Sequence, residues 1–212
     1  MSGNKPELDW ARFTSNQTRL TPRVSVVRSK RRPEYAAAAP PKAYLNVQVT
    51  GRETSYFEWL GAGFYYSGLS GTPTNGQARA LREVRYGFDE RFFYLCVDPM
   101  TDLLYAISEA EFRILLRGSD ELRLLIAIES GRVAGSLLDT EDNCILGTHD
   151  LVRSAFDKML EVSIGRGLVR GLGASLMLQV ELWREGLLVE RLPADGSIEV
   201  KLGADAFAWE TE

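Results

Sequence analysis

From residue 44 onward the sequence is a succession of short apolar runs separated by turn residues, and this pattern most limits the possible folds. The runs span residues 44–49, 84–88, 92–97, 112–116, 122–128, 133–138, 152–156, 159–164, 176–183, 187–192 and 198–202, with Gly, Asp, Ser or Pro between them. The pattern lacks sustained helical periodicity, and the connections are too short for crossover helices. Residues 84–88 and 92–97, joined by Asp89, Glu90 and Arg91, have the signature of a hairpin. The sequence therefore predicts an all-β fold, an antiparallel two-sheet β-sandwich of the jelly-roll type.

Residues 1–43 differ from the rest of the chain in charge and composition. They contain nine Lys or Arg and three Asp or Glu, a net charge of +6; the whole chain carries −4, so the remainder carries −10. A run of alanines followed by Pro40 and Pro41 is typical of a linker. We expect a basic, flexible leader with an Ala/Pro linker over 1–43, a β-sandwich over 44–203 and a tail over 204–212. Nucleic acid is not the expected partner, because the acidic body would oppose phosphate binding.

Length and composition favour one globular domain. The 212 residues are enough for one buried core, and 45% of them are hydrophobic. No apolar run reaches the roughly 18 to 20 residues needed to cross a bilayer, and the start of the chain has no apolar signal segment. We therefore expect a cytoplasmic protein without a membrane partner. Cys96 and Cys144 both fall in strand-like runs, which predicts buried thiols and no disulfide framework.

Residues that usually carry catalysis or hold a metal are sparse. His149 is the single histidine, and it lies in a polar turn without a nucleophile nearby in sequence. The glycines of residues 165–171 follow a GxGxxxG spacing ahead of a strand-like run, which favours turn glycines over a phosphate loop. No His/Cys cluster suited to zinc is present in the sequence. The sequence thus predicts no metal, no cofactor and no phosphate-binding loop.

Carboxylates are the remaining candidates for chemistry. The acidic residues in or beside apolar runs are Glu58, Asp89, Asp98, Asp157 and Glu161. Glycoside hydrolysis uses two such groups about 5 to 10 Å apart, a separation that a sequence does not contain. Asp89 suits a turn and Glu161 suits a strand. We therefore expect a protein that is not an enzyme, with a small standalone hydrolase as the less favoured alternative.

The most distinctive stretch is residues 54–68, TSYFEWLGAGFYYSG, which contains six aromatic residues. Exposed aromatic rings stack on the apolar faces of sugars, so Trp59, Tyr65 and Tyr66 with Glu58 predict a glycan platform. The competing interpretation places Phe57, Trp59 and Phe64 in the core. Adjacent strand residues point to opposite faces, so one of Tyr65 and Tyr66 should be exposed. Trp183, at the end of the run 176–183, has the same two interpretations.

Two segments also carry a resemblance to a known family. The runs VTGRETSYFEWLGAGFYY and REVRYGFDERFFYLCVD resemble the non-catalytic β-sandwich on the C-terminal side of some family 57 glycoside hydrolases, which is itself similar to DOMON-like, family 9 carbohydrate-binding modules. The matching features are Gly51 and Trp59, an aromatic residue and Asp at 88–89, a strand ending in Asp over 94–98, and the strand around Glu161. The resemblance covers residues 44–202. Thr50 and Gly165 depart from it, where the family has an acidic residue and a proline.

The resemblance implies an accessory module without its enzyme, because only the basic leader precedes the sandwich in this sequence. The function that it implies is carbohydrate binding, with α-glucans as the ligand class. Trp59, Tyr65, Tyr66 and Trp183 would stack on the sugar, and Glu58 would bond its hydroxyls. The alternative is a scaffolding β-sandwich that uses the same aromatic surface to pair with a separately encoded carbohydrate-active enzyme.

Overall fold

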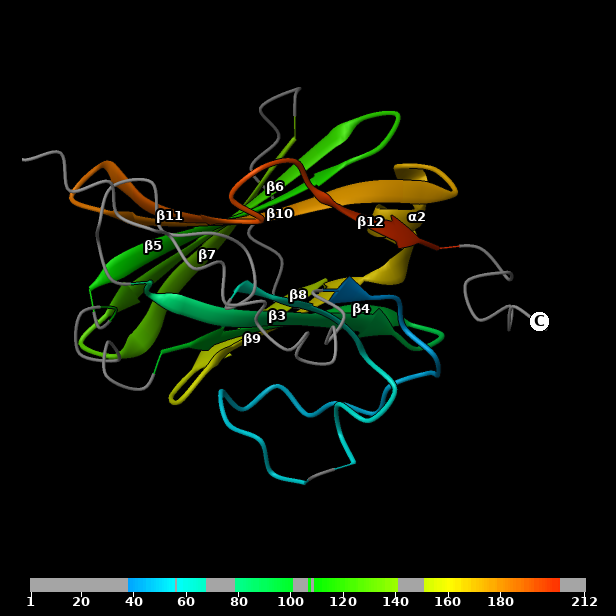
Figure 1. Cartoon of the computed structure of the whole chain (residues 1–212), viewed down its shortest axis with the longest axis horizontal. Helices are drawn as coiled ribbons and strands as arrows, with labels where there is room; N and C mark the ends of the chain where they lie inside the picture. Colours follow the sequence, from blue (N-terminus) through cyan, green and yellow to red (C-terminus); the bar gives the residue numbers. More distant parts are fainter. Residues whose placement is uncertain are drawn as a thin grey trace, which may run out of the picture. The chain divides into compact units, whose positions relative to one another are not determined.

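Two antiparallel sheets packed against each other form the fold, which confirms the predicted β-sandwich (Figure 1). The computed structural model describes residues 38–55, 57–67, 79–100, 107, 109–140 and 151–202. His149, Cys144, Tyr56, the residues of the leader before 38 and those of the predicted tail lie outside the described residues.

Sheet A has the strand order β1-β2-β3-β4-β9-β8, with every neighbouring pair antiparallel. Its strands are β1 (Ala38–Ala39), β2 (Gly63–Tyr66), β3 (Leu81–Phe88), β4 (Phe92–Pro99), β8 (Val152–Phe156) and β9 (Leu160–Gly165). The predicted hairpin is the β3–β4 pair, in which Phe88 lies opposite Phe93. Asp89 closes its turn by accepting hydrogen bonds from the backbone N–H groups of Arg91 and Phe92, both at 2.6 Å.

Sheet B has the order β11-β10-β5-β6-β7, and β12 also pairs with β10. Its strands are β5 (Ala110–Arg117), β6 (Glu121–Glu129), β7 (Arg132–Thr140), β10 (Ser175–Arg184), β11 (Leu187–Leu192) and β12 (Ile198–Lys201). Both β11 and β12 lie along β10, β12 beside residues 175–178 and β11 beside 180–184. Residues 193–197 separate them, and the side-chain amide of Gln179 donates to the carbonyl of Gly196 there, at 2.9 Å.

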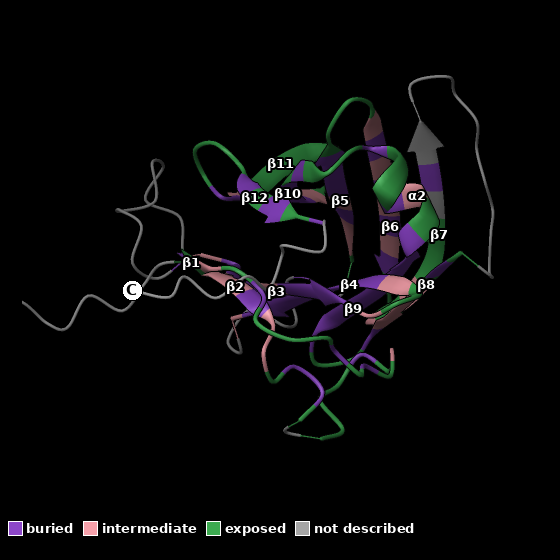
Figure 2. Ribbon diagram, turned by 90° about the vertical axis from the view of Figure 1, so that its right-hand side faces the viewer, coloured by how far each residue is buried: buried purple, intermediate pink, exposed green. Residues whose placement is uncertain are grey.

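Alternation of apolar and polar residues explains why the sheets face each other. On β10, Leu176, Leu178, Val180 and Leu182 are buried and point to the core, while the intervening residues point outward. The strands that enclose the core are mostly buried in Figure 2. The core residues include Val84, Tyr86, Phe88, Phe93, Leu95, Val97, Phe112, Ile114, Leu124, Val162 and Ile164.

The Ala/Pro segment belongs to the domain, and the predicted linker is shorter than expected. Ala38 and Ala39 pair with Tyr65 and Phe64 as an edge strand, and the backbone N–H of Lys42 donates to the carbonyl of Gly61 at 2.7 Å. Contacts within the chain divide it between Tyr35 and Ala36, eight residues before the predicted boundary at 43/44. Small alanines can pair at a sheet edge without burying apolar surface, so composition alone suggested a linker.

Residues 165–171, expected to be a glycine-rich turn, contain a short helix, α2 (Arg166–Gly171), between β9 and β10. Arg166 in this helix is buried; its guanidinium donates to the carbonyls of Asp89 at 2.6 Å and Leu202 at 3.4 Å and lies over the ring of Phe88. The helix therefore ties the β3–β4 turn to the end of β12. None of the helices in the described ranges has the length and apolar character needed to cross a membrane.

Residues 41–55 and 57–62, called here the covering segment, lie over the outer face of sheet A, on the side away from sheet B (Figures 1 and 2). Residues 44–49 were predicted to be a strand, but they are irregular and cover the sheet. Apolar side chains of the covering segment and of the sheet beneath it form a second cluster that is separate from the main core. Its members are Leu45, Val47, Trp59, Tyr94, Cys96 and Met159.

Candidate functional site

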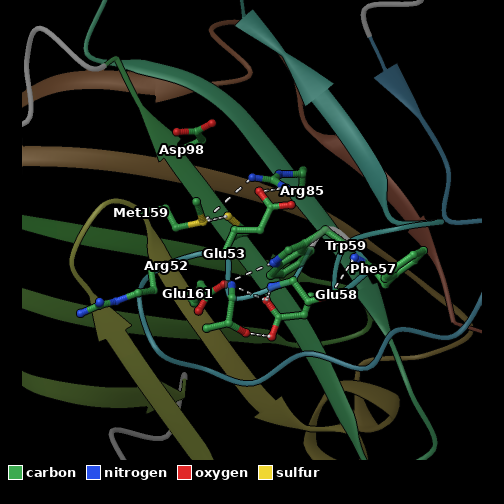
Figure 3. A network of polar contacts seen from close by, with 12 residues as sticks. Arg52, Glu53, Phe57, Glu58, Trp59, Arg85, Asp98, Met159 and Glu161 are labelled. Carbon is green, nitrogen blue, oxygen red and sulfur yellow. Dashed lines mark hydrogen bonds and ion pairs between the residues drawn. The ribbon is translucent and has the colours of Figure 1, made fainter.

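A fully buried carboxylate, Glu161 on β9, holds the covering segment against sheet A (Figure 3). It accepts hydrogen bonds from the backbone N–H groups of Thr50 and Gly51, both at 2.9 Å, and from the indole Nε1 of Trp59 at 3.2 Å. Gly51 has a φ of +81°, and a Cβ there would lie 2.6 Å from the backbone nitrogen of Asp157. Because Glu161 accepts three hydrogen bonds from one segment, we assign its carboxylate a structural role.

Trp59 is buried, with 6% of its surface exposed. The guanidinium carbon of Arg85 lies 5.6 Å from the centroid of its ring. Cys96 and Met159 belong to the same cluster, and burial raises the pKa of the Cys96 thiol. Trp59 thus has the core position of the competing interpretation, although in the outer cluster and not between the sheets, and its ring is not part of an open platform.

Glu58 is also buried and is engaged within its own loop. It accepts hydrogen bonds from Thr54 Oγ1 at 2.6 Å and from the backbone N–H groups of Thr54 and Ser55 at 3.0 and 3.4 Å. Desolvation would raise the pKa of Glu58, but the hydrogen bonds from Thr54 and Ser55 outweigh it and lower the pKa below its usual value. Its oxygens stabilise the turn, so Glu58 and Trp59 both serve the covering segment.

Phe57 is turned outward, with 72% of its surface exposed, whereas the sequence made it a candidate for the core. Leu60 in the same turn is 56% exposed. The turn over residues 57–61 directs Trp59 inward and these neighbours outward. A local apolar pattern could not show which side chain faces inward, because the segment is not a strand with a two-residue period.

Tyr65 and Tyr66 point to opposite faces of β2, as expected for adjacent strand residues. Tyr66 lies opposite Glu83, is 37% exposed and is the more accessible of the two. Tyr65 lies opposite Val84 and is partly buried against the main core. The two rings therefore cannot act on one ligand from the same face.

Tyr65 lines a pocket between the edges of the two sheets. The pocket has a volume of about 350 Å³ and opens where β1 and β2 of sheet A face the 193–197 loop and β12 of sheet B. Its lining residues are Ala38, Ala39, Pro40, Tyr65, Tyr86, Pro193, Asp195, Ser197, Ile198 and Glu199. Burial raises the pKa of Tyr86 to about 12. Aromatic walls with a few polar groups at the mouth are typical of small-molecule sites.

Trp183 lies on the outer face of sheet B, remote in the fold from the covering segment on sheet A. Its indole Nε1 donates to Glu181 at 2.8 Å, and the guanidinium of Arg113 stacks 3.8 Å from its ring centroid. Glu181 is buried and also pairs with Arg191 at 2.7 Å. A sugar ring stacking on the face that Arg113 occupies would have to displace that guanidinium.

The structure does not gather the predicted contact residues into one site. Glu58 and Trp59 fix the covering segment, Tyr66 lies on the outer side of sheet A, Trp183 lies on the outer side of sheet B, and only Tyr65 lines the pocket. Sequence reasoning missed the other lining residues, because the pocket joins residues 38–40 to residues 193–199. Over the described ranges, no group of three or more His, Cys, Asp or Glu residues is arranged to hold a metal ion.

Comparison with known proteins found no match to a family model, to a curated protein or to a solved structure. The fold and the geometry of the pocket are therefore the basis for a functional proposal.

Proposed function

We propose that this protein is a non-catalytic carbohydrate-binding module whose ligand occupies the pocket beside Tyr65. The pocket itself is the observation that carries the proposal. It has an aromatic wall for the apolar face of a sugar ring, and the exposed residues Asp195 and Ser197 in its lining can bond hydroxyl groups. Its volume lies in the range of about 300 to 1,000 Å³ that is usual for ligand sites.

The ligand class proposed is an α-glucan, by analogy with the accessory sandwich of family 57 glycoside hydrolases that the sequence resembles. The roles of the buried carboxylates support binding without catalysis. Glu58 and Glu161 each accept hydrogen bonds from two backbone N–H groups, and one oxygen of the half-buried Glu190 accepts those of Ala80 and Leu81 at 2.6 and 2.9 Å. These carboxylates hold the fold together.

The test is affinity electrophoresis through gels that contain glycogen, amylose, xylan or β-glucan, with a non-binding protein alongside. Retardation is expected in the α-glucan gels. Tyr65→Leu should abolish it, because the substitution keeps an apolar side chain and removes the flat ring. Trp183→Ala, on the other sheet, is the matched aromatic control and should be retarded like the wild type.

Circular dichroism of each variant shows that the fold is kept. Absence of retardation in every gel would overturn carbohydrate binding. Retardation that survives Tyr65→Leu and is lost in Trp183→Ala would instead move the site to the outer face of sheet B.

A scaffolding function is the second candidate, and the exposed residues of β11 favour it. Leu187, Leu188 and Val189 are 72%, 42% and 40% exposed, and among the described strands β11 is outermost on its sheet. An apolar edge strand is a template for pairing with another chain. Sedimentation of the protein with a purified family 57 glycoside hydrolase should then show a complex that Leu187→Lys weakens, while unchanged sedimentation of the mixture would contradict scaffolding of that enzyme.

A further inference from the structure

We infer that the buried hydroxyl of Tyr86 selects the ligand of the pocket by accepting a hydrogen bond from one of its hydroxyl groups. This inference rests on the proposed function and concerns the part of the sugar that the pocket recognises. Tyr86 lies on β3 and lines the pocket, yet only 2% of its surface is exposed. The other polar residues of the lining are half-buried, as is Tyr65, or exposed, as are Asp195, Ser197 and Glu199. Tyr86 is therefore the most deeply buried polar side chain of the lining.

The side chain of Tyr86 reaches from β3 past β2 to β1. Tyr86 lies opposite Gly63 of β2, and it belongs to the core between the sheets. A Cβ at Gly63 would lie 2.8 Å from Tyr86 Cζ, the ring carbon that carries the hydroxyl. The hydroxyl donates to the carbonyl of Ala39 on β1, 3.4 Å away. Because Ala39 also lines the pocket, this contact places the hydroxyl at the wall that β1 forms.

The hydroxyl of Tyr86 has unused capacity for hydrogen bonding. O–H···O bonds are usually about 2.7 to 2.8 Å long, so the bond to Ala39 at 3.4 Å is a long one. A tyrosine oxygen can also accept a hydrogen bond, and no donor in the described ranges donates to this oxygen. A ligand hydroxyl that donates to it would satisfy a polar group that is otherwise buried without an incoming hydrogen bond.

Apolar residues share the lining with Tyr86. Pro40 and Pro193 have no backbone N–H group to offer a ligand, and Ile198 is buried. A sugar that turns an apolar face to these residues and a hydroxyl to Tyr86 matches both features of the pocket. A site with a buried hydrogen-bonding group discriminates against an analogue that lacks the matching hydroxyl, because its own group is then left unpaired.

The experiment is titration calorimetry with maltose and with derivatives of maltose that each lack one hydroxyl group. The wild-type protein is expected to bind at least one deoxy derivative about three- to tenfold more weakly than maltose. Tyr86→Phe keeps the ring and removes the oxygen, so it should bind maltose more weakly by the same factor. The variant should also bind maltose and that derivative equally, since the two losses describe one contact.

Tyr94→Phe is the matched control. The hydroxyl of Tyr94 bonds Asp89 at 2.7 Å and lies in the outer cluster of sheet A, so this variant should bind every sugar like the wild type. The urea midpoint of Tyr86→Phe should stay close to that of the wild type, because only the long bond to Ala39 is lost.

Two outcomes separate this inference from the proposed function. If Tyr86→Phe binds maltose as tightly as the wild type, or keeps the full discrimination against every deoxy derivative, the role of Tyr86 is overturned and carbohydrate binding stands. If the wild type binds none of the sugars, the proposed function is overturned together with it.

Discussion

The outer faces of the two sheets each carry a buried glutamate bonded to a tryptophan indole, but the two pairs have different roles. On sheet A, Glu161 also bonds the backbone of Thr50 and Gly51, more than 100 positions away in sequence, and so fixes a covering segment. On sheet B, Glu181 bonds Trp183, two residues away, and Arg191 of the neighbouring strand. The Glu–Trp pair on sheet A therefore lies beneath the covering segment, whereas the pair on sheet B lies at a surface that carries charged side chains.

The difference teaches that surroundings determine whether an aromatic residue is available to a ligand. Trp59 is buried beneath the segment that contains it, whereas Trp183 is only partly buried and is covered on one face by Arg113. Paired substitutions, one on each sheet, can therefore test the comparison directly.

The largest difference is expected between the two tryptophans. Trp59→Ala should lower the free energy of unfolding by about 3 to 5 kcal/mol, because it removes a buried indole and leaves a cavity in the outer cluster. Trp183→Ala should cost about 1 kcal/mol, since the lost contacts are a partly exposed stack and one hydrogen bond. Urea unfolding followed by circular dichroism measures both free energies. Equal losses of unfolding free energy would refute the distinction between a buried tryptophan on sheet A and a partly exposed one on sheet B.

The glutamates should follow the same order, with the larger loss of unfolding free energy on sheet A. Glu161→Ala leaves three donors without an acceptor, two of them buried, and should cost about 3 kcal/mol. Glu181→Ala should cost about 1 kcal/mol, because Arg191 is 41% exposed and can be hydrated. Hydrogen exchange should show faster exchange of the Thr50 and Gly51 amides in Glu161→Ala only; protected amides there would mean that other contacts hold the segment.

Gly51→Ala tests the backbone of the covering segment without touching either glutamate. A φ of +81° is unfavourable for alanine, and the new Cβ would collide with the backbone of Phe156 and Asp157. The expected loss is about 2 kcal/mol in urea unfolding. Gly131→Ala is the control, with a φ of +72° and no atom within 4 Å of the methyl carbon that it adds, and it should be less destabilising. Equal losses for the two would attribute the effect to φ alone.

The smallest effect is the pH dependence that Glu58 contributes. Its pKa in the folded protein lies below the ordinary value of 4.5, so its contribution to stability is complete above that value and is lost as the pH falls through the folded pKa. Glu58→Gln should therefore flatten the decline of unfolding free energy in acid, measured by urea titrations between about pH 3 and 6. A decline as steep as in the wild type would assign the acid sensitivity to other groups.

Strand positions were predictable where a two-residue period marks a strand that faces the core. The run 122–128, for instance, became β6, with Leu122, Leu124, Ile126 and Ile128 all buried. The helix α2 was missed because glycines at 167 and 171 weaken the helical signal. The strand predicted over 44–49 was wrong because an apolar segment that packs on the outside of a sheet can resemble a strand in composition.

The candidate site was less predictable than the fold. Tyr65 could be selected as an aromatic residue on a strand, but its pocket needs Ala38, Pro193 and Glu199, which are brought together only by the packing of two sheet edges. The position of Glu161 on a strand was predictable, yet the segment that it anchors is distant in sequence. Long-range juxtaposition of this kind has no periodic signature in a single sequence.

The shortness of β1 has a mechanical consequence. Its two residues form an edge strand of sheet A and also one wall of the pocket. Only two residue pairs join β1 to β2, so β1 can detach while the longer strands of sheet A stay paired. Detachment of β1 would remove one wall of the pocket without unfolding the sandwich.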